Sequence, residues 1–281
     1  MTRSPHRRTI PFLAIAAAAA IGLAGCAAGD DAGDEASSGY VTDGVFTVAT
    51  GEPAYYPWVI DDAPETGEGF EAAVAYAVAE QLGFAEDDVV WVRTGFEEAI
   101  QPGPKDFDVN LQQFSITEER RQNVDFSSPY YETTQVVVTI AGSPAAEATS
   151  LAELKPLLIG AATGTTSFQA IEAAIAPDAG AQVFNTNDDA KLALQNGTVD
   201  AIVVDLPTAF YLTGVELEDG VLVGQLPPSA GTGDAFGFVL AKDSPLTAEV
   251  SAAVDALRED GTLDAIAEEW LASAGDAPVL E

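Results

Sequence analysis

Residues 115–131 read SITEERRQNVDFSSPYY. This segment lies between two stretches with strand character, 107–114 and the β-branched run 134–140. On either side, short β-rich runs and segments with helical periodicity alternate along the chain. Strands that alternate with helices are typical of α/β layers with mostly parallel sheets. We therefore predict an α/β fold.

The alternation covers both halves of the chain. In the first half, strands are predicted near 45–48 and 89–92, and the apolar positions between Phe70 and Leu82 recur at helical spacing. In the second half, Asn187 is expected to cap a helix, and a cap followed by Pro245 at the first helical position is expected to begin another. The remaining predicted elements are helices at 151–154, 166–176, 187–197, 244–261 and 263–270, and strands at 158–160, 199–204 and 235–240.

Composition limits the chemistry that the chain can perform. There are 45 acidic residues against 11 basic ones, for a net charge of −34. A polyanion repels nucleic acid and anionic lipid headgroups, so we expect neither as a partner. The single histidine, His6, lies in the N-terminal segment that we predict to be removed, so neither histidine catalysis nor a histidine metal site is expected. We expect no cofactor and no metal.

The N-terminal segment has the features of an export signal. Residues 1–8 are basic, and 10–23 form an Ala-rich apolar run that is shorter than the ~20 residues needed to cross a bilayer. Leu23-Ala24-Gly25-Cys26 follows, with the only cysteine of the chain. This motif resembles the lipobox of bacterial lipoproteins, whose cysteine is acylated; an ordinary secretory signal is the alternative. We predict a signal peptide over 1–25, lipidation of Cys26 with palmitate, and a flexible acidic tether over 26–43.

Four patterns occur in a fixed order along the rest of the chain. They are GEPAYYPW at 51–58, Gly69-Phe70-Glu71 at the start of a helix, the segment 115–131, and finally Gly164-Thr165-Thr166 with 199–205. In this order they resemble the polar amino-acid-binding family of extracellular solute-binding proteins, the receptors of ABC importers. The resemblance extends over roughly 44–272. Ala73 departs from the family, which usually has a second acid there, and so do Gln112 and Gln113, where small residues are usual.

The resemblance implies a fold with the ligand in a cleft. It is a two-lobed periplasmic-binding-protein-like fold (type II) with two hinge crossings. Lobe 1 would combine 44–138 with 237–274, and lobe 2 would be 139–236. The stretch from Thr134 to Ile140 and the stretch near Ala235 would be the two crossings.

The resemblance also implies residues that bind the carboxylate of an amino acid. Arg120 matches the family's carboxylate-binding arginine, and a guanidinium offers two parallel N–H donors; a surface pair with a nearby glutamate is the alternative. Thr165 and Thr166 stand where backbone N–H groups at a helix start favour an anion, although a simple helix cap is also open. Ser115 would add a hydroxyl group.

An acid and a group of polar and aromatic residues would bind the remainder of the ligand. Asp205 follows a predicted buried strand and matches the family's ammonium-binding acid; a helix cap for Leu206 onward is the alternative. Tyr55 would contact the ligand, whereas Trp58 could equally pack within a lobe. Glu52 could pair with a cationic side chain or cap a turn. Gln113, with Gln112, would suit a polar side chain.

These inferences lead to a predicted function. We expect a lipid-anchored receptor at the extracytoplasmic face of the cell membrane, which binds a polar or cationic amino acid and delivers it to ABC permease subunits. We expect a monomer with no enzymatic activity. Two alternatives remain open: an enzyme on the same fold, similar to the dehydratases that act on cyclohexadienyl acids, with Glu52 as proton donor, and a ligand-sensing signalling subunit.

Overall fold

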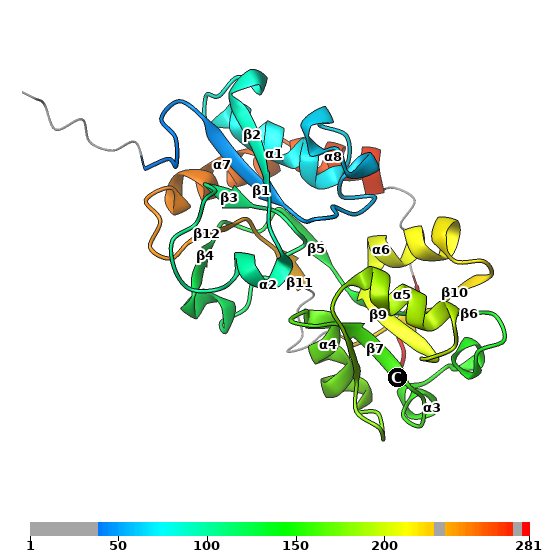
Figure 1. Cartoon of the computed structure of the whole chain (residues 1–281). Coiled ribbons are helices and arrows are strands. Elements are labelled where there is room, and N and C mark those ends of the chain that lie inside the picture. Colours follow the sequence, from blue (N-terminus) through cyan, green and yellow to red (C-terminus); the bar gives the residue numbers. More distant parts are fainter. Residues whose placement is uncertain (1–38, 228–233, 272–276) are drawn as a thin grey trace, which may run out of the picture. The chain divides into compact units, whose positions relative to one another are not determined.

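A computed structural model describes residues 39–227, 234–271 and 277–281 (Figure 1). The predicted signal peptide, Cys26 and most of the predicted tether therefore lie outside the described residues. Residues 37–281 form one compact unit. No helix in the described ranges combines the length and the apolar character that a membrane span requires.

The first lobe is built on a five-stranded sheet with the order β2-β1-β3-β12-β4. Its strands are β1 (Phe46–Thr50), β2 (Val89–Arg93), β3 (Val109–Asn110), β4 (Val124–Phe126) and β12 (Val239–Ala241). β1 pairs in parallel with β2 and β3, and β12 runs antiparallel to β3 and β4. The helices of this lobe are α1 (Phe70–Gln81), α2 (Phe96–Ala99), α7 (Thr247–Glu259) and α8 (Thr262–Leu271). Apolar side chains of α1, α7 and α8 share one core with β1.

The second lobe is built on another five-stranded sheet, with the order β10-β6-β9-β7-β8. Its strands are β6 (Gln135–Ile140), β7 (Ile159–Ala162), β8 (Gln182–Phe184), β9 (Ala201–Asp205) and β10 (Gly220–Gln225). Its helices are α3 (Leu151–Leu154), α4 (Thr166–Ala170), α5 (Asn187–Gln195) and α6 (Leu206–Tyr211).

Both faces of the second sheet are covered. Val137 and Val203 belong to one apolar cluster, whereas their neighbours Val136 and Val204 belong to another. Successive side chains of a strand point to opposite faces, so an uninterrupted apolar run supplies two cores. This explains why β6 and β9 consist almost entirely of buried residues.

Two segments connect the sheets. The chain passes from β4 through β5 (Tyr131–Thr133) to β6, and it returns from β10 through β11 (Asp234–Phe236) to β12. β5 and β11 pair with each other in an antiparallel two-stranded sheet. The two sheets and these two crossings confirm the predicted two-lobed α/β fold.

Residues 277–281 lie on the second sheet, a placement that the sequence did not predict. Val279 forms a parallel bridge with Gln225 of β10. Leu280 is buried in a core of the second lobe, and the carbonyl oxygen of Glu281 accepts a hydrogen bond from the Leu151 amide at 3.1 Å. The chain therefore returns to the second lobe after α8.

Two predicted strands are shorter or divided in the structure. The strand expected over 107–114 is reduced to the two residues of β3, which pair with β1 and β12. Gln113, inside the predicted strand, has a left-handed backbone (φ 51°) that an extended strand does not contain. The strand expected over 235–240 is divided into β11 and β12. Between them the Gly237 amide donates to the Phe114 carbonyl, and the Phe238 amide donates to Ser127 Oγ. The segment changes pairing partners there.

Three local details also differ from the predictions. Thr186, rather than Asn187, caps α5, and its hydroxyl accepts a hydrogen bond from the Asp189 amide at 3.1 Å. α7 begins at Thr247, so Pro245 precedes the helix instead of occupying its first position. The sheets were expected to be mostly parallel; β9 pairs in parallel with β7 but antiparallel with β6.

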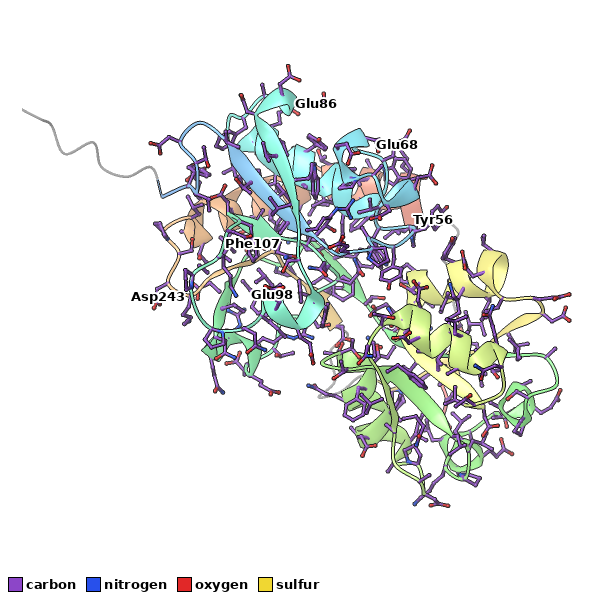
Figure 2. All side chains as sticks on the ribbon, in the orientation of Figure 1. Tyr56, Glu68, Glu86, Glu98, Phe107 and Asp243 are labelled. Carbon is purple, nitrogen blue, oxygen red and sulfur yellow. The ribbon has the colours of Figure 1, made fainter. Side chains whose placement is uncertain are left out.

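The acidic residues are spread over the surface. Figure 2 shows Glu68, Glu86, Glu98 and Asp243 pointing away from the ribbon, and all four are exposed. Among the described residues, the carboxylates of Glu71 and Asp108 are buried. Glu71 lies at the cavity described next, whereas Asp108 accepts hydrogen bonds from the Val41 and Thr47 amides near the start of β1.

Candidate functional site

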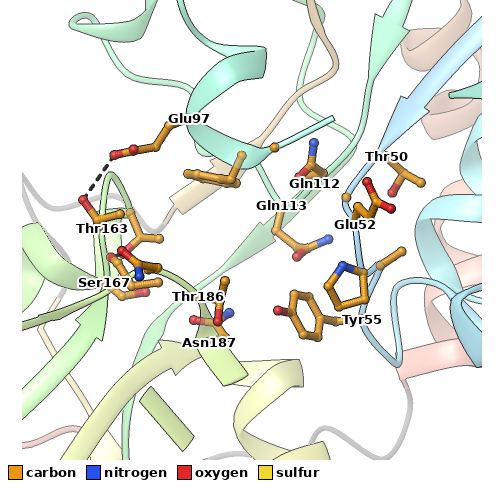
Figure 3. A pocket seen from close by; sticks show the side chains of 18 of the residues that line it. Thr50, Glu52, Tyr55, Glu97, Gln112, Gln113, Thr163, Ser167, Thr186 and Asn187 are labelled. Carbon is orange, nitrogen blue, oxygen red and sulfur yellow. Dashed lines mark hydrogen bonds between the residues drawn. The ribbon is translucent and has the colours of Figure 1, made fainter. Parts of the chain in front are cut away.

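A cavity of about 340 Å³ is lined by residues of both lobes (Figure 3). Its volume is within the range of pockets that hold small molecules. The first lobe contributes the loop after β1, α2 and the residues that follow β3. The second lobe contributes the residues that follow β7, β8 and β9. The carboxyl ends of strands in an α/β sheet are the usual place for a ligand site, because the loops there converge.

Arg120 is a buried cation at this cavity, with 7% of its surface exposed. Its Nη1 donates to the Ser115 carbonyl at 2.7 Å, and its Nη2 donates to the Gly164 carbonyl at 2.9 Å. These two acceptors belong to different lobes. Burial lowers the pKa of Arg120 to about 10, so the side chain remains charged at neutral pH.

The surroundings of Arg120 hold the guanidinium in place. Its central carbon lies 5.4 Å from the ring centre of Phe96 and 5.8 Å from that of Phe114, and these two rings stack with their centroids 4.5 Å apart. The surface ion pair that was the alternative for Arg120 is made by Arg121, with Glu118 at 3.7 Å. Phe96 lines the cavity and was not among the predicted site residues. A phenylalanine in a short helix carries no local signal of such a position.

Thr165 and Thr166 occupy the start of α4, as expected. Thr165 caps the helix by accepting from the Phe168 amide at 3.1 Å, so the cap that was open as an alternative exists, and Thr165 also lines the cavity. Thr166 donates to Asp234 Oδ2 at 2.9 Å, which leaves Ser115 Oγ as the donor to Thr166 at 3.0 Å. Ser115 is buried and lies behind the lining residues.

Asp205 ends β9 and lines the cavity. Its side chain makes no capping hydrogen bond to α6, so the alternative role as a helix cap is absent. Its Oδ1 instead accepts from Gln135 Nε2 at 2.8 Å. Burial, followed by the nearby charge of Asp234, raises the pKa of Asp205 to about 7. An added cation at Asp205 would favour its ionised form.

Asp234 was not predicted at the site. It shares the amide group of Gln135 with Asp205, and it accepts from Thr166. Its position follows from the pairing of β11 with β5, which a sequence pattern does not show.

Glu71 is the other unpredicted acid. It is almost fully buried in the first turn of α1 and lines the cavity. Its Oε1 accepts from the Gln113 amide at 2.7 Å and from the Tyr130 hydroxyl, and its Oε2 accepts from Gln113 Nε2. Burial raises the pKa of Glu71 to about 7 against these hydrogen bonds. The motif Gly69-Phe70-Glu71 indicated a helix start but no role in the cavity.

The remaining predicted residues divide into two groups. Glu52, Tyr55 and Gln113 line the cavity and lie together in Figure 3, as does Gln112. Trp58 does not line it: the indole is fully buried in the first core, and its Nε1 donates to Thr208 Oγ1 at 3.1 Å.

Tyr55 and Glu52 differ in their surroundings. Burial, and next the charge of Asp188, raises the pKa of Tyr55 to about 12, so its hydroxyl keeps its proton. Glu52 is exposed, and its carboxylate has no protein partner among the described residues. No cluster of three or more potential metal ligands occurs in the ranges that the structure describes.

Comparisons with known proteins agree with this arrangement. Residues 47–273 match the bacterial extracellular solute-binding proteins, family 3. The L-arginine-binding protein of Pseudomonas aeruginosa is 30% identical over 235 residues, which are 78% of this chain and 85% of that protein. The structure of an ancestral arginine-binding protein bound to arginine is 32% identical with a TM-score of 0.66, and the match covers 81% of this chain and 98% of that one.

One similar structure bears on catalysis. It is an ancestral amino acid-binding protein described as a precursor of cyclohexadienyl dehydratase, with 29% identity and a TM-score of 0.66, and the match covers 81% of this chain and 95% of that one. Proteins on this fold therefore include amino-acid binders and an ancestor of an enzyme.

The family match extends over most of the chain, and the chain belongs to the bacterial extracellular solute-binding proteins of family 3.

Proposed function

We propose that this protein is a lipid-anchored receptor of an ABC importer that binds a polar or cationic amino acid between its two lobes. The observation that supports this most strongly is the pairing of Arg120 and Asp205 at one cavity. They present a fixed cation and an acid, which match the carboxylate and the ammonium group of a free amino acid. Arg120 would bind the carboxylate with help from Ser115, Thr165 and Thr166.

Asp205 would bind the ammonium group. Within the described ranges its carboxyl has a single protein donor, Gln135, so acceptor capacity remains for a ligand. Tyr55 would cover the side chain of the ligand, while Glu52 and Gln113 would bind its polar end. Trp58 would support the loop that carries Tyr55, because it is buried in the core beside it.

The proposed lobes also suggest how binding is coupled to transport. If lobe 1 comprises 44–138 with 237–274 and lobe 2 comprises 139–236, the ligand contacts both. A ligand that binds the closed form better than the open form shifts the population toward closure. The permease would then recognise the closed receptor.

The predicted lipobox and the family support the proposed location and partner. Residues 1–25 would direct export, and acylated Cys26 would hold the receptor at the extracytoplasmic face of the membrane, beside its permease. The described protein would extend from a tether over 26–43 as a monomer.

Binding without catalysis is the better-supported activity. The curated relative described above is named as a binding protein, and the cavity pairs charges suited to capture. The dehydratase alternative requires a proton donor, and Glu52, the residue considered for it, is exposed.

A thermal-shift screen tests the proposed function. The protein without its signal peptide is mixed with each of the 20 amino acids, with citrulline and ornithine added. A ligand at 100 times its Kd stabilises the folded state by about 2.7 kcal/mol, which raises the melting temperature by a few degrees. The absence of a shift with every compound would overturn the proposal.

A further inference from the structure

Glu71 fixes the orientation of the Gln113 side chain. The backbone amide of Gln113 donates to Glu71 Oε1 at 2.7 Å, and its side-chain Nε2 donates to Glu71 Oε2. Above pH ~7, where Glu71 is ionised, its carboxylate only accepts hydrogen bonds, so the NH₂ group of Gln113 faces it. The left-handed backbone of Gln113 belongs to the same arrangement, and the Tyr130 hydroxyl donates a further hydrogen bond to Glu71 Oε1.

This geometry leaves the amide oxygen of Gln113 for the cavity. Gln113 is half-buried and lines the cavity, and no protein donor to its Oε1 occurs among the described residues. Gln112 is oriented in the same sense, because its Nε2 donates to Asn110 Oδ1 at 3.0 Å. Both glutamines therefore direct their NH₂ groups to protein acceptors.

The other charged side chains that line this part of the cavity are acidic. Glu52, Glu97 and Glu98 line the cavity and are exposed. Of the described residues that line the cavity, only Arg120 is basic, and it is held by two carbonyl groups next to the start of α4. A ligand side chain that reaches Glu52 and Gln113 thus meets acceptors.

We propose that Glu71 is a positioning residue that sets the ligand selectivity of this cavity through Gln113. By holding the NH₂ group of Gln113, it presents the amide oxygen to the ligand and favours a side chain that carries only N–H donors, such as a guanidinium or an ammonium group. A side chain that ends in a carbonyl oxygen meets an acceptor instead of a donor. This inference rests on the proposed function, because it concerns the side chain of a bound amino acid.

Glu71→Gln should reverse the orientation of the Gln113 side-chain amide. The new amide keeps its oxygen toward the Gln113 backbone N–H and the Tyr130 hydroxyl, which places its own NH₂ group where Oε2 was. Gln113 then turns its oxygen to that NH₂ group and its NH₂ group to the cavity. The substitution is almost isosteric, so the shape of the cavity is kept.

The probes are arginine and citrulline, which differ by a carbonyl oxygen in place of one guanidinium nitrogen. Isothermal titration of the wild type should show arginine at least tenfold tighter than citrulline. In Glu71→Gln this preference should fall by about tenfold. In a Gln113→Met background, Glu71→Gln should leave the preference unchanged, because the amide through which Glu71 acts is gone. Tyr130→Phe, which removes the other side-chain hydrogen bond to Glu71, should keep the wild-type preference.

The outcomes separate the inference from the proposed function. If no amino acid binds the wild type, the proposed function is wrong. If the wild type binds citrulline or glutamine as tightly as arginine, or if Glu71→Gln retains the full preference for arginine while binding either probe, the selectivity role of Glu71 is wrong and the receptor remains. If Glu71→Gln binds neither probe, its thermal unfolding, measured with and without Tyr130→Phe, shows whether the variant is folded. A folded Glu71→Gln that binds neither probe overturns the positioning role. If Glu71→Gln is unfolded, Gln113→Met becomes the test, and that variant must itself show a lower preference for arginine.

Discussion

Arg120 shows how one side chain can be fixed before a ligand arrives. Two carbonyl groups and two aromatic rings hold its guanidinium, yet a guanidinium carries five N–H donors and only two have protein acceptors among the described residues. The remaining donors are available for a carboxylate. Lysine has the charge but lacks the planar fork.

Arg120→Lys should therefore reduce amino-acid binding by about 100-fold, since a charge-assisted bidentate contact contributes about 3 kcal/mol. Isothermal titration with the best ligand of the thermal-shift screen measures the loss. Arg121→Lys is the matched control, because that residue pairs with Glu118 on the surface. Equal affinities of the two variants would remove Arg120 from the binding site.

The raised pKa of Asp205 should make the free energy of unfolding depend on pH. Its pKa is about 7 in the folded protein and near 3.9 in an unfolded chain, so the folded state holds the proton more tightly. This contribution to stability is fully present below pH ~4 and is lost as the pH rises through 7. Asp205→Asn removes the part of the pH dependence that comes from Asp205. From pH 5 to pH 8 the ligand-free wild type should lose about 1–3 kcal/mol relative to this variant in urea unfolding.

The control for this measurement is Asp243→Asn, at an exposed position. It should follow the wild-type dependence on pH. Saturating amino acid should flatten the wild-type curve, because its ammonium group favours the ionised carboxyl. Parallel curves for the wild type and Asp205→Asn would show that Asp205 is not the titrating group.

At the scale of elements, Gly69 determines how α1 begins. Its backbone has φ 106° and ψ 154°, a region that only glycine occupies readily, and an added Cβ would lie 2.6 Å from the Trp58 carbonyl oxygen. This turn directs Glu71 into the cavity. Gly69→Ala should lower the free energy of unfolding by about 2–4 kcal/mol, as measured by urea unfolding.

Gly83→Ala separates the cost of the steric contact with Trp58 from the cost of a positive φ. Gly83 also has a positive φ, of 88°, but an added Cβ would meet nothing within 4 Å. It should cost about 1 kcal/mol. Similar losses at both positions would mean that the Trp58 contact is relieved by a small shift of the loop.

The elements that the sequence predicted well are those whose signals are local. The helix from Phe70 has periodic apolar positions and the strand that became β6 is a continuous β-branched run, and the structure confirms both. The division of the strand at Gly237 and the short β3 depend on pairing partners far along the chain, which periodicity does not contain.

The cavity shows the same division. Arg120 and Asp205 were predicted from motifs, and the structure places both at the cavity. Glu71, Gln113 and Tyr130 come from three separate segments, and only folding makes their hydrogen-bond network. Trp58 is an aromatic residue, which can serve either as a ligand contact or as part of a core. Only its packing in the structure shows that it lies in the core.

At the scale of the whole molecule, the proposed anchor has a direct test. Cys26→Ala should move the protein from the membrane fraction to the secreted or released fraction, because no acyl chains can be attached. Fractionation followed by a carbonate wash measures this. Cys26→Ser gives the matched control for side-chain size and should behave in the same way. Retention of either variant on membranes would contradict lipidation at this position.

The attachment of residues 277–281 to β10 gives the molecule a third connection, or strap, between its two lobes. α8 ends on the first lobe at Leu271, and the Ala277 carbonyl accepts a hydrogen bond from Gln225 Nε2 on the second lobe. At most about 20 Å of backbone therefore connects the two residues. We expect this connection to limit how far the two lobes can separate, so that the ligand-free protein remains partly closed. Leu280→Asp would place a charge in the core that holds the strap. The radius of gyration of the ligand-free protein should then increase in small-angle scattering, whereas the ligand-saturated protein should keep its wild-type value.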